Sequence, residues 1–252
     1  MKYYESHEEA YRKIKKNNMS SWGEFCKESE PFKNFYMKKY LVSALDKIKP
    51  ISNARVLEIG CGTGPISCFL AQEGYDVYGF DVSQTAIEIA RENAKERSLD
   101  IHYSVDDICS ISKTKSDIYD IIIDGNCMHC ITYDSDRHSA LTNVFRLLKD
   151  GGYYIIDTMS WEDPSKRILD KQIDGQIDEK GILWNNVKED YPYDKVKFED
   201  KYWICTRRIM TPGDLENELK QIGFLIEHIE IIKDEKVEYL ADFRAICRKP
   251  IP

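Results

Sequence analysis

The sequence VLEIGCGTGPISCFLA, residues 56–71, predicts a buried strand, a glycine-rich turn and a helix in immediate succession. Residues 55–59 (RVLEI) predict a short buried strand. After the turn, Ile66, Phe69 and Leu70 share one helix face at the spacing i, i+3 and i+4. Glycines at 60, 62 and 64 permit unusual φ values and close approach of a ligand. The stretch therefore predicts an α/β unit with a ligand site at the helix N-terminus.

The composition is that of a soluble globular chain of 252 residues, with 42% hydrophobic and 32% charged residues. A net charge of −8 argues against unspecific binding to nucleic acid, which needs clustered basic residues. The first sixteen residues, MKYYESHEEAYRKIKK, contain no apolar segment, so we expect neither a secretion signal nor a membrane span. Eight cysteines without such a signal suit reduced thiols and a cytoplasmic location. The single C-x-x-C at residues 127–130 has no second pair at zinc-finger spacing, so we expect no metal site.

A second strand is predicted at residues 76–80 and is followed directly by an acid, Asp81. The order of the motifs distinguishes two classes of ligand. Dinucleotide enzymes need a third glycine where this chain has Pro65. Asp81 lies about twenty residues beyond Gly60, where a strand-end carboxylate can accept hydrogen bonds from both ribose hydroxyls. The alternative is that Asp81 caps the following helix, although Ser83 is better placed for that role.

Two further strands are predicted at residues 101–105 and 119–124, and each is followed by polar residues. The first precedes Asp106, Asp107 and Ile108, and the second, a continuous apolar run, precedes GNCMHC at 125–130. We expect a helix at about 136–148, ended by the glycines of KDGG at 149–152. A fifth strand follows at 153–158.

The motif E-x-G-x-G-x-G from Glu58, the strand-end Asp81 and the later Asp-Ile pair together resemble the class I S-adenosylmethionine (SAM) dependent methyltransferases. The resemblance implies a Rossmann-like, mostly parallel seven-stranded sheet with the last strand antiparallel and helices on both faces. It implies SAM as cofactor, with S-adenosylhomocysteine as product. Asp107 would accept a hydrogen bond from the adenine amino group, and Ile108 would pack on the adenine ring. Asp106 is the alternative in register, and either acid could be a solvated loop residue. The implied cofactor-binding residues are Glu58, Gly60, Cys61, Gly62, Gly64, Asp81, Val82, Asp107, Ile108, Gly125 and Asn126.

The remaining segments predict additions to this core, which we assign to residues 51–159 and 211–252. Residues 1–50 are helical and aromatic, and they either pack on the sheet or form a lid with Trp22 or Tyr36 touching the cofactor. Residues 160–210 show no sustained helical or strand periodicity of apolar residues. We expect them to form a cap inserted over the substrate, or a small satellite core. Thr211-Pro212 opens a helix, and residues 224–231 and 242–247 predict a closing strand pair.

His129 is the one titratable side chain near the expected methyl position, as a candidate base or orienting group. The alternative is that His129 merely packs beside the cofactor. The family's base-methylating DNA enzymes carry an N-P-P-Y-type tetrad, where this chain has Asp-Gly-Asn-Cys at 124–127. We therefore expect O- or N-methylation of a small molecule, with no nucleic-acid or membrane partner. Methylation of a peptide or protein side chain, or SAM binding without catalysis, are the alternatives, and the oligomeric state stays open.

Overall fold

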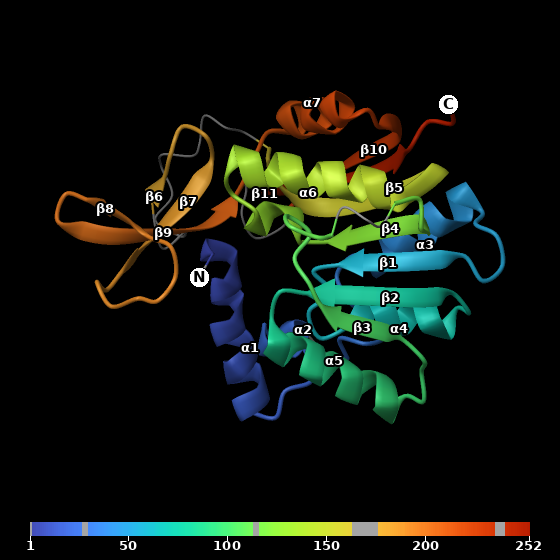
Figure 1. Cartoon of the computed structure of the whole chain (residues 1–252), viewed down its shortest axis with the longest axis horizontal. Helices are drawn as coiled ribbons and strands as arrows, with labels where there is room; N and C mark the ends of the chain where they lie inside the picture. The colour runs from blue at the N-terminus through green and yellow to red at the C-terminus, as the bar shows by residue number, and fades with distance from the viewer. Residues whose placement is uncertain (1, 27–29, 113–115, 163–175, 235–239) are drawn as a thin grey trace.

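A computed structural model describes residues 2–26, 30–112, 116–162, 176–234 and 240–252. Its main sheet has seven strands in the order β10-β11-β5-β4-β1-β2-β3 (Figure 1). These strands are β1 (Arg55–Ile59), β2 (Asp76–Asp81), β3 (His102–Val105), β4 (Tyr119–Gly125), β5 (Leu148–Trp161), β10 (Leu225–Lys233) and β11 (Leu240–Arg248). β1 pairs in parallel with both β2 and β4, whereas β11 runs antiparallel to β5 and β10. The predicted fold class, with an antiparallel last strand, is confirmed.

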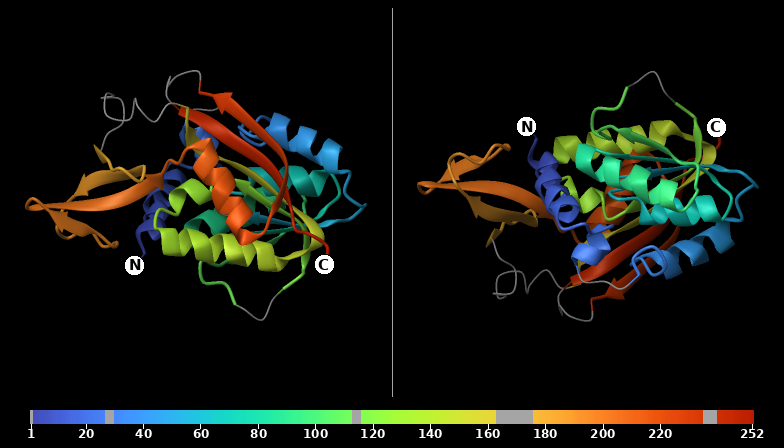
Figure 2. Two further views of the ribbon diagram at one scale, coloured as in Figure 1. Left: turned by 90° about the horizontal axis from the view of Figure 1, so that it is seen from above. Right: turned by 90° about the horizontal axis from the view of Figure 1, so that it is seen from below.

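Helices cover both faces of the sheet because the central strands alternate their side chains between two apolar layers. Val56 of β1 packs with α3 (Lys38–Ile48) and α4 (Pro65–Gln72), while Leu57 packs with α6 (Asp134–Leu147) and α7 (Pro212–Ile222). The helix α5 (Gln84–Glu96) lies against β2 and β3 on the α4 side. In the left view of Figure 2, α6 and α7 lie on one side of the sheet and α3 lies on the other.

Strand β5 differs from the expectation for residues 149–152. The helix α6 ends at Leu147, and β5 begins at once with Leu148, which pairs with Tyr119 of β4. Gly151, at a φ of +76°, therefore lies inside an irregular stretch of strand instead of ending the helix. The pairing of Leu148 with β4 and the backbone hydrogen bonds of Gly151 and Gly152 with Lys249 hold this stretch extended, against the local helix-ending signal.

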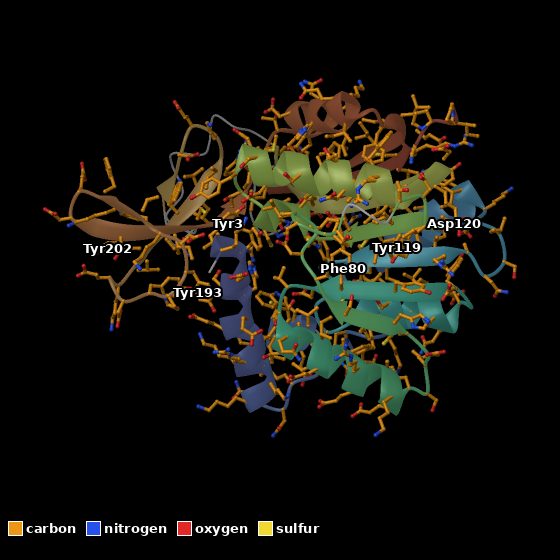
Figure 3. The ribbon with its side chains drawn as sticks, in the orientation of Figure 1. Tyr3, Phe80, Tyr119, Asp120, Tyr193 and Tyr202 are labelled. Carbon is orange, nitrogen blue, oxygen red and sulfur yellow. The ribbon has the colours of Figure 1, made fainter. Side chains whose placement is uncertain are left out.

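The inserted region forms a second, antiparallel sheet in the order β6-β7-β9-β8, which projects from the main body in Figure 1. Its strands are β6 (Gln176–Ile177), β7 (Ile182–Val187), β8 (Val196–Phe198) and β9 (Lys201–Arg208). The N-terminal elements are the 3-10 helix η1 (Tyr3–Ser6), α1 (His7–Lys16) and α2 (Trp22–Phe25). Tyr3 and Tyr193 share one buried cluster where the N-terminus meets the second sheet. Tyr202 lies on the part of the second sheet that projects from the main body (Figure 3). Within the described ranges, no helix has the length and apolarity needed to cross a membrane.

Candidate functional site

The turn after β1 adopts backbone conformations that side-chain-bearing residues avoid. Gly60 and Gly62 have φ values of +60° and +53°. A Cβ on Gly60 would lie 2.7 Å from Cys127 Sγ, and a Cβ on Gly62 would lie 2.7 Å from the Tyr11 hydroxyl oxygen. Glycine is thus required twice here, for its φ and for the close approach of two other segments.

Asp81 ties this turn to the turn after β2. Its Oδ2 accepts from the Gly62 amide at 2.9 Å, and its Oδ1 accepts from the Ser83 amide at 2.9 Å. Burial raises the pKa of Asp81, and the two amide hydrogen bonds oppose that rise. Because each carboxylate oxygen can accept more than one hydrogen bond, Asp81 retains acceptor capacity toward the pocket.

Glu58 is a buried carboxyl on β1, beside the same turn. It accepts from the Ser67 amide at 2.8 Å and from the Ser67 hydroxyl. Burial raises the pKa of Glu58 to about 8, with further upward contributions from the charges of Asp81 and Asp124. A cation placed beside Glu58 would favour its ionised form.

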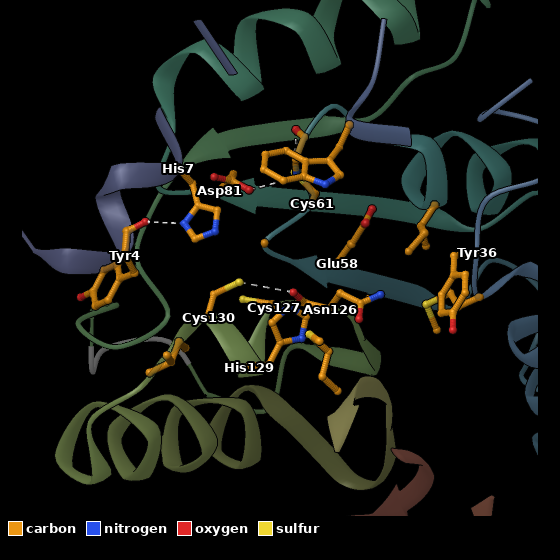
Figure 4. Close-up of a pocket in the computed structure, with 18 of the residues that line it drawn as sticks. Tyr4, His7, Tyr36, Glu58, Cys61, Asp81, Asn126, Cys127, His129 and Cys130 are labelled. Atoms are coloured by element: carbon orange, nitrogen blue, oxygen red, sulfur yellow. Dashed lines mark hydrogen bonds between the residues drawn. The ribbon is translucent and has the colours of Figure 1, made fainter. Parts of the chain in front are cut away.

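A pocket of about 500 Å³ opens at the carboxyl ends of β1, β2 and β4 (Figure 4). Open α/β sheets bind their ligands at this edge. The residues singled out from the sequence that line it are Trp22, Tyr36, Glu58, Gly60, Cys61, Gly62, Asp81, Val82, Asp107, Ile108, Gly125, Asn126 and His129. Gly64 does not line the pocket; it is the N-cap of α4, with a φ of +83°.

Asp107 and the alternative acid Asp106 both line the pocket, so the structure keeps both within reach of a ligand. Asp107 already accepts from the Tyr4 hydroxyl at 2.9 Å, and its neighbour Asp106 accepts from the Asp107 amide. Ile108 is buried, as expected of a side chain that packs on a ring.

The loop after β4 is fixed by Asp124, a residue that the sequence patterns did not mark as functional. Asp124 accepts from the amides of Cys127 and Met128 at 2.7 and 3.2 Å, and burial raises its pKa to about 7. This loop carries His129, which is only 5% exposed. Burial lowers the pKa of His129, and its Nδ1 lies 3.4 Å from the Thr158 hydroxyl oxygen. A neutral imidazole facing the pocket is able to accept a proton.

Three pocket residues from distant segments were not identified from the sequence: His7 and Tyr11 of α1, and Arg207 of β9. Arg207 Nη1 lies 2.9 Å from His7 Nε2, while His7 Nδ1 lies 3.0 Å from the Tyr4 carbonyl oxygen. Arginine only donates and a carbonyl only accepts, so these contacts select the His7 tautomer that carries its proton on Nδ1. Only the docking of both segments on the core brings these residues to the site.

Trp22 and Tyr36 form two further parts of the pocket wall. The Trp22 ring lies 5.6 Å from the Tyr11 ring, centroid to centroid. The Tyr36 hydroxyl donates to the Asp242 carboxylate of β11, and Asp242 also faces Arg244 at 3.7 Å. The N-terminal segment is thereby held to the sheet on one side of the pocket.

Comparison with known proteins identifies the family. A family described as "Methyltransferase domain" matches residues 51–237, more than half of the 252-residue chain. "Ubiquinone biosynthesis O-methyltransferase" of Coxiella burnetii is 32% identical over 110 residues, covering 44% of this chain and 45% of that protein. Its namesake from Bordetella avium is 29% identical, covering 44% of each chain. The chain thus spans less than half the length of these relatives.

Solved structures share the fold over most of the chain. A SAM-dependent methyltransferase from Methanosarcina mazei has a TM-score of 0.63 at 22% identity, covering 82% of this chain and 98% of that one. The Burkholderia thailandensis 1,6-didemethyltoxoflavin-N1-methyltransferase, solved with S-adenosylhomocysteine, has a TM-score of 0.58 at 12% identity, covering 85% and 78%. At these identities the likeness concerns the fold.

Proposed function

The chain belongs to the class I methyltransferase family, and from that premise we propose that it transfers a methyl group from SAM to an oxygen or nitrogen atom of a small molecule. One observation carries the proposal: two buried carboxyls, Glu58 and Asp81, meet the left-handed glycine turn at the ligand-binding edge of the sheet. The chemistry that SAM supplies is an activated methyl group on a positively charged sulfur.

The residues present fit such a cofactor. SAM carries cationic groups, and the raised pKa of Glu58 is the signature of a buried carboxyl without a cation beside it. Asp81 has acceptor capacity left for ribose hydroxyls. We assign the cofactor to Glu58, Asp81 and the turn from Gly60 to Gly64, with Asp107 and Ile108 on its adenine side. Val82, Gly125, Asn126 and Cys61 complete this proposed site.

The protein's own contribution is mainly to position the acceptor and exclude water. Such positioning is worth about 7–11 kcal/mol in favourable cases. His129 is our candidate for accepting the acceptor's proton or orienting the acceptor, and a base of this kind adds roughly 10²–10⁴-fold. The neutral state of His129, held by burial, suits either role.

We assign residues 1–50 as a lid and 160–210 as a substrate cap over the core; within these ranges, residues 1, 27–29 and 163–175 lie outside the described residues. His7, Tyr11, Trp22 and Tyr36 reach the pocket from the first segment, and Arg207 reaches it from the second. A pocket of about 500 Å³ with these walls has the size of small-molecule sites. The relatives named for ubiquinone biosynthesis and for toxoflavin methylation also point to small acceptors.

The test combines calorimetric titration with SAM and a chromatographic assay of S-adenosylhomocysteine formation with phenol, amine and peptide acceptors. We expect SAM binding, and product formation with small acceptors. Turnover with the peptides alone would replace the small-molecule proposal by side-chain methylation. Binding without turnover of any acceptor would favour a SAM-binding module, and absence of binding would contradict the cofactor assignment.

A further inference from the structure

Cys130 ends the 3-10 helix η2 (Met128–Cys130), at a point of the pocket where basic side chains from three elements converge. His129 comes from the same helix, His7 from α1 and Arg207 from β9. Figure 4 shows the Cys130 side chain between the rings of His7 and His129, pointing toward Asn126. The residue is partly exposed, so a small molecule in the pocket can reach its sulfur.

The sulfur has a partner in each protonation state. As a thiol it donates to the backbone carbonyl oxygen of Asn126, at an S···O distance of 3.7 Å. As a thiolate it is stabilised by the charge of Arg207 and by a hydrogen bond from His129. A group that gains and loses a proton during a reaction needs both kinds of partner.

The charges around Cys130 favour its ionised form. Burial by itself raises its pKa, but the positive charge of Arg207, together with the neighbouring imidazoles of His129 and His7, outweighs burial and holds the pKa well below the usual range of a thiol. The carboxylates of Asp81 and Asp124 face it from β2 and β4 and act in the opposite direction.

Its pocket neighbours behave differently, which sets Cys130 apart. Burial raises the pKa of Cys61 and of Cys127 well above the usual range, and the charge of Asp124 raises that of Cys127 further. The phenol of Tyr11 is likewise kept neutral, because burial raises its pKa.

His129 is less free to receive a proton directly. One ring nitrogen lies against the Thr158 hydroxyl, and the imidazole also hydrogen-bonds the Cys130 sulfur. The Cys130 sulfur, in contrast, belongs to a partly exposed residue that lines the same pocket.

We propose that the Cys130 sulfur, supported by His129 and Arg207, is the proton acceptor for the substrate, and that the methyl acceptor is an acidic phenol or thiol. This inference rests on the proposed methyl transfer and narrows its substrate class. The X–H bond of the acceptor breaks, and its proton passes to the Cys130 thiolate. The electron pair on X then forms the bond to the methyl carbon, and the electrons of the broken carbon–sulfur bond stay on the cofactor's sulfur. Cys130 later releases the proton to solvent.

Charge balance explains why an acidic acceptor suits this site. Before the proton moves, Arg207 faces the thiolate; afterwards it faces the acceptor anion, so the net charge of the pocket is unchanged. A base works best when its pKa lies near the working pH, and a thiol and a phenol, with ordinary pKa values of about 8.5 and about 10, are acidic enough to give up a proton to such a base. An aliphatic alcohol is a far weaker acid, and a neutral amine can attack before it loses a proton.

The first test measures the thiolate directly and needs no turnover. The alkylation rate of Cys130 by iodoacetamide is followed by peptide mass spectrometry over a series of pH values, with N-acetylcysteine as the reference thiol. We expect the midpoint of the rate–pH curve at least about one pH unit below that of the reference, and an upward move of the midpoint in Arg207→Gln. A wild-type midpoint equal to or above the reference would overturn the proposal.

The second test compares four acceptors on one ring: thiophenol, phenol, aniline and benzyl alcohol. We expect S-adenosylhomocysteine formation from the first two, and a loss on the order of 10²-fold with phenol in Cys130→Ala near neutral pH. At higher pH, Cys130→Ala should recover with phenol because the acceptor then ionises in solution, a rescue that a structural defect would not show. Thiophenol, an aromatic thiol, is largely ionised near neutral pH, so its turnover should depend much less on Cys130.

Wild-type turnover limited to aniline or benzyl alcohol, or of none of the four despite SAM binding, would overturn the acceptor class. Full activity and an unchanged pH profile in Cys130→Ala would overturn the role of the sulfur. Absence of SAM binding in calorimetry would instead reject the proposed function, and the alkylation curve would still report on the thiolate.

Discussion

Replacement of Glu58 by glutamine tests the electrostatics of the site without a cofactor. The carboxyl is 3% exposed, accepts from the amide and hydroxyl of Ser67, and has its pKa raised to about 8 by burial. Glutamine keeps the shape and an acceptor oxygen but cannot ionise. The difference between the two proteins in free energy of unfolding therefore reports the cost of the buried charge.

The expected size follows from the two ends of the titration. A carboxyl that ionises near 4.5 in the unfolded chain and near 8 in the folded one carries a difference of about 5 kcal/mol, at about 1.4 kcal/mol per pH unit. Below about pH 4.5 both states are protonated and Glu58 contributes nothing. Between these values only the unfolded state ionises, so wild-type stability falls relative to Glu58→Gln as pH rises. Above about pH 8 the difference stays constant.

Urea unfolding followed by tryptophan fluorescence measures this difference at several pH values between about 5 and about 9. We expect Glu58→Gln to gain stability over the wild type progressively across this window. Glu73→Gln, at the exposed C-cap of α4, is the matched control and should track the wild type. A Glu58→Gln difference that is the same at every pH would refute the reasoning.

Three further substitutions test, in turn, the proposed ribose acceptor, the glycine turn and the anchoring of the N-terminal segment. Asp81→Asn should weaken SAM binding by about tenfold or more in calorimetry, through loss of a charge-assisted acceptor; unchanged affinity would remove Asp81 from the cofactor site. Gly62→Ala should lower thermal stability by about 1–3 kcal/mol because of its left-handed φ and the nearby Tyr11 hydroxyl, whereas Gly213→Ala should not, because a Cβ there would meet only the Thr211 hydroxyl oxygen at 4.0 Å. Glu8→Gln weakens an acceptor for three hydrogen bonds from the start of α5, so amide exchange in α1 should accelerate by about tenfold, and unchanged exchange would contradict this anchoring.

The core of the fold could be predicted because its local signals agree with its tertiary environment. The continuous apolar run of β4 reflects burial on both faces, and β1 is buried from Val56 to Ile59. The closing strand pair is present at Leu225–Lys233 and Leu240–Arg248. The second sheet escaped prediction because its strands are partly exposed along most of their length: in β7 only Ile182 is fully buried. Neither a continuous run nor a clean alternation marks such strands.

The residues of the site likewise fall into those that the sequence predicts and those that only the tertiary structure brings to the pocket. Glu58, Gly60, Gly62 and Asp81 stand next to one another in the pocket because strand ends of a parallel sheet meet at one edge, which spacing alone reveals. His7, Tyr11 and Arg207 reach the pocket only because the N-terminus and the second sheet pack together. That contact joins residues two hundred positions apart and leaves no local pattern in the sequence.

The most direct measurement of the central claim is a crystal structure of the protein with S-adenosylhomocysteine. The account predicts the molecule above the turn from Gly60 to Gly64, with its ribose hydroxyls on Asp81 and its sulfur facing the side of the pocket that holds His129 and Cys130. S-adenosylhomocysteine bound away from this turn, or a nicotinamide dinucleotide bound there in its place, would contradict it.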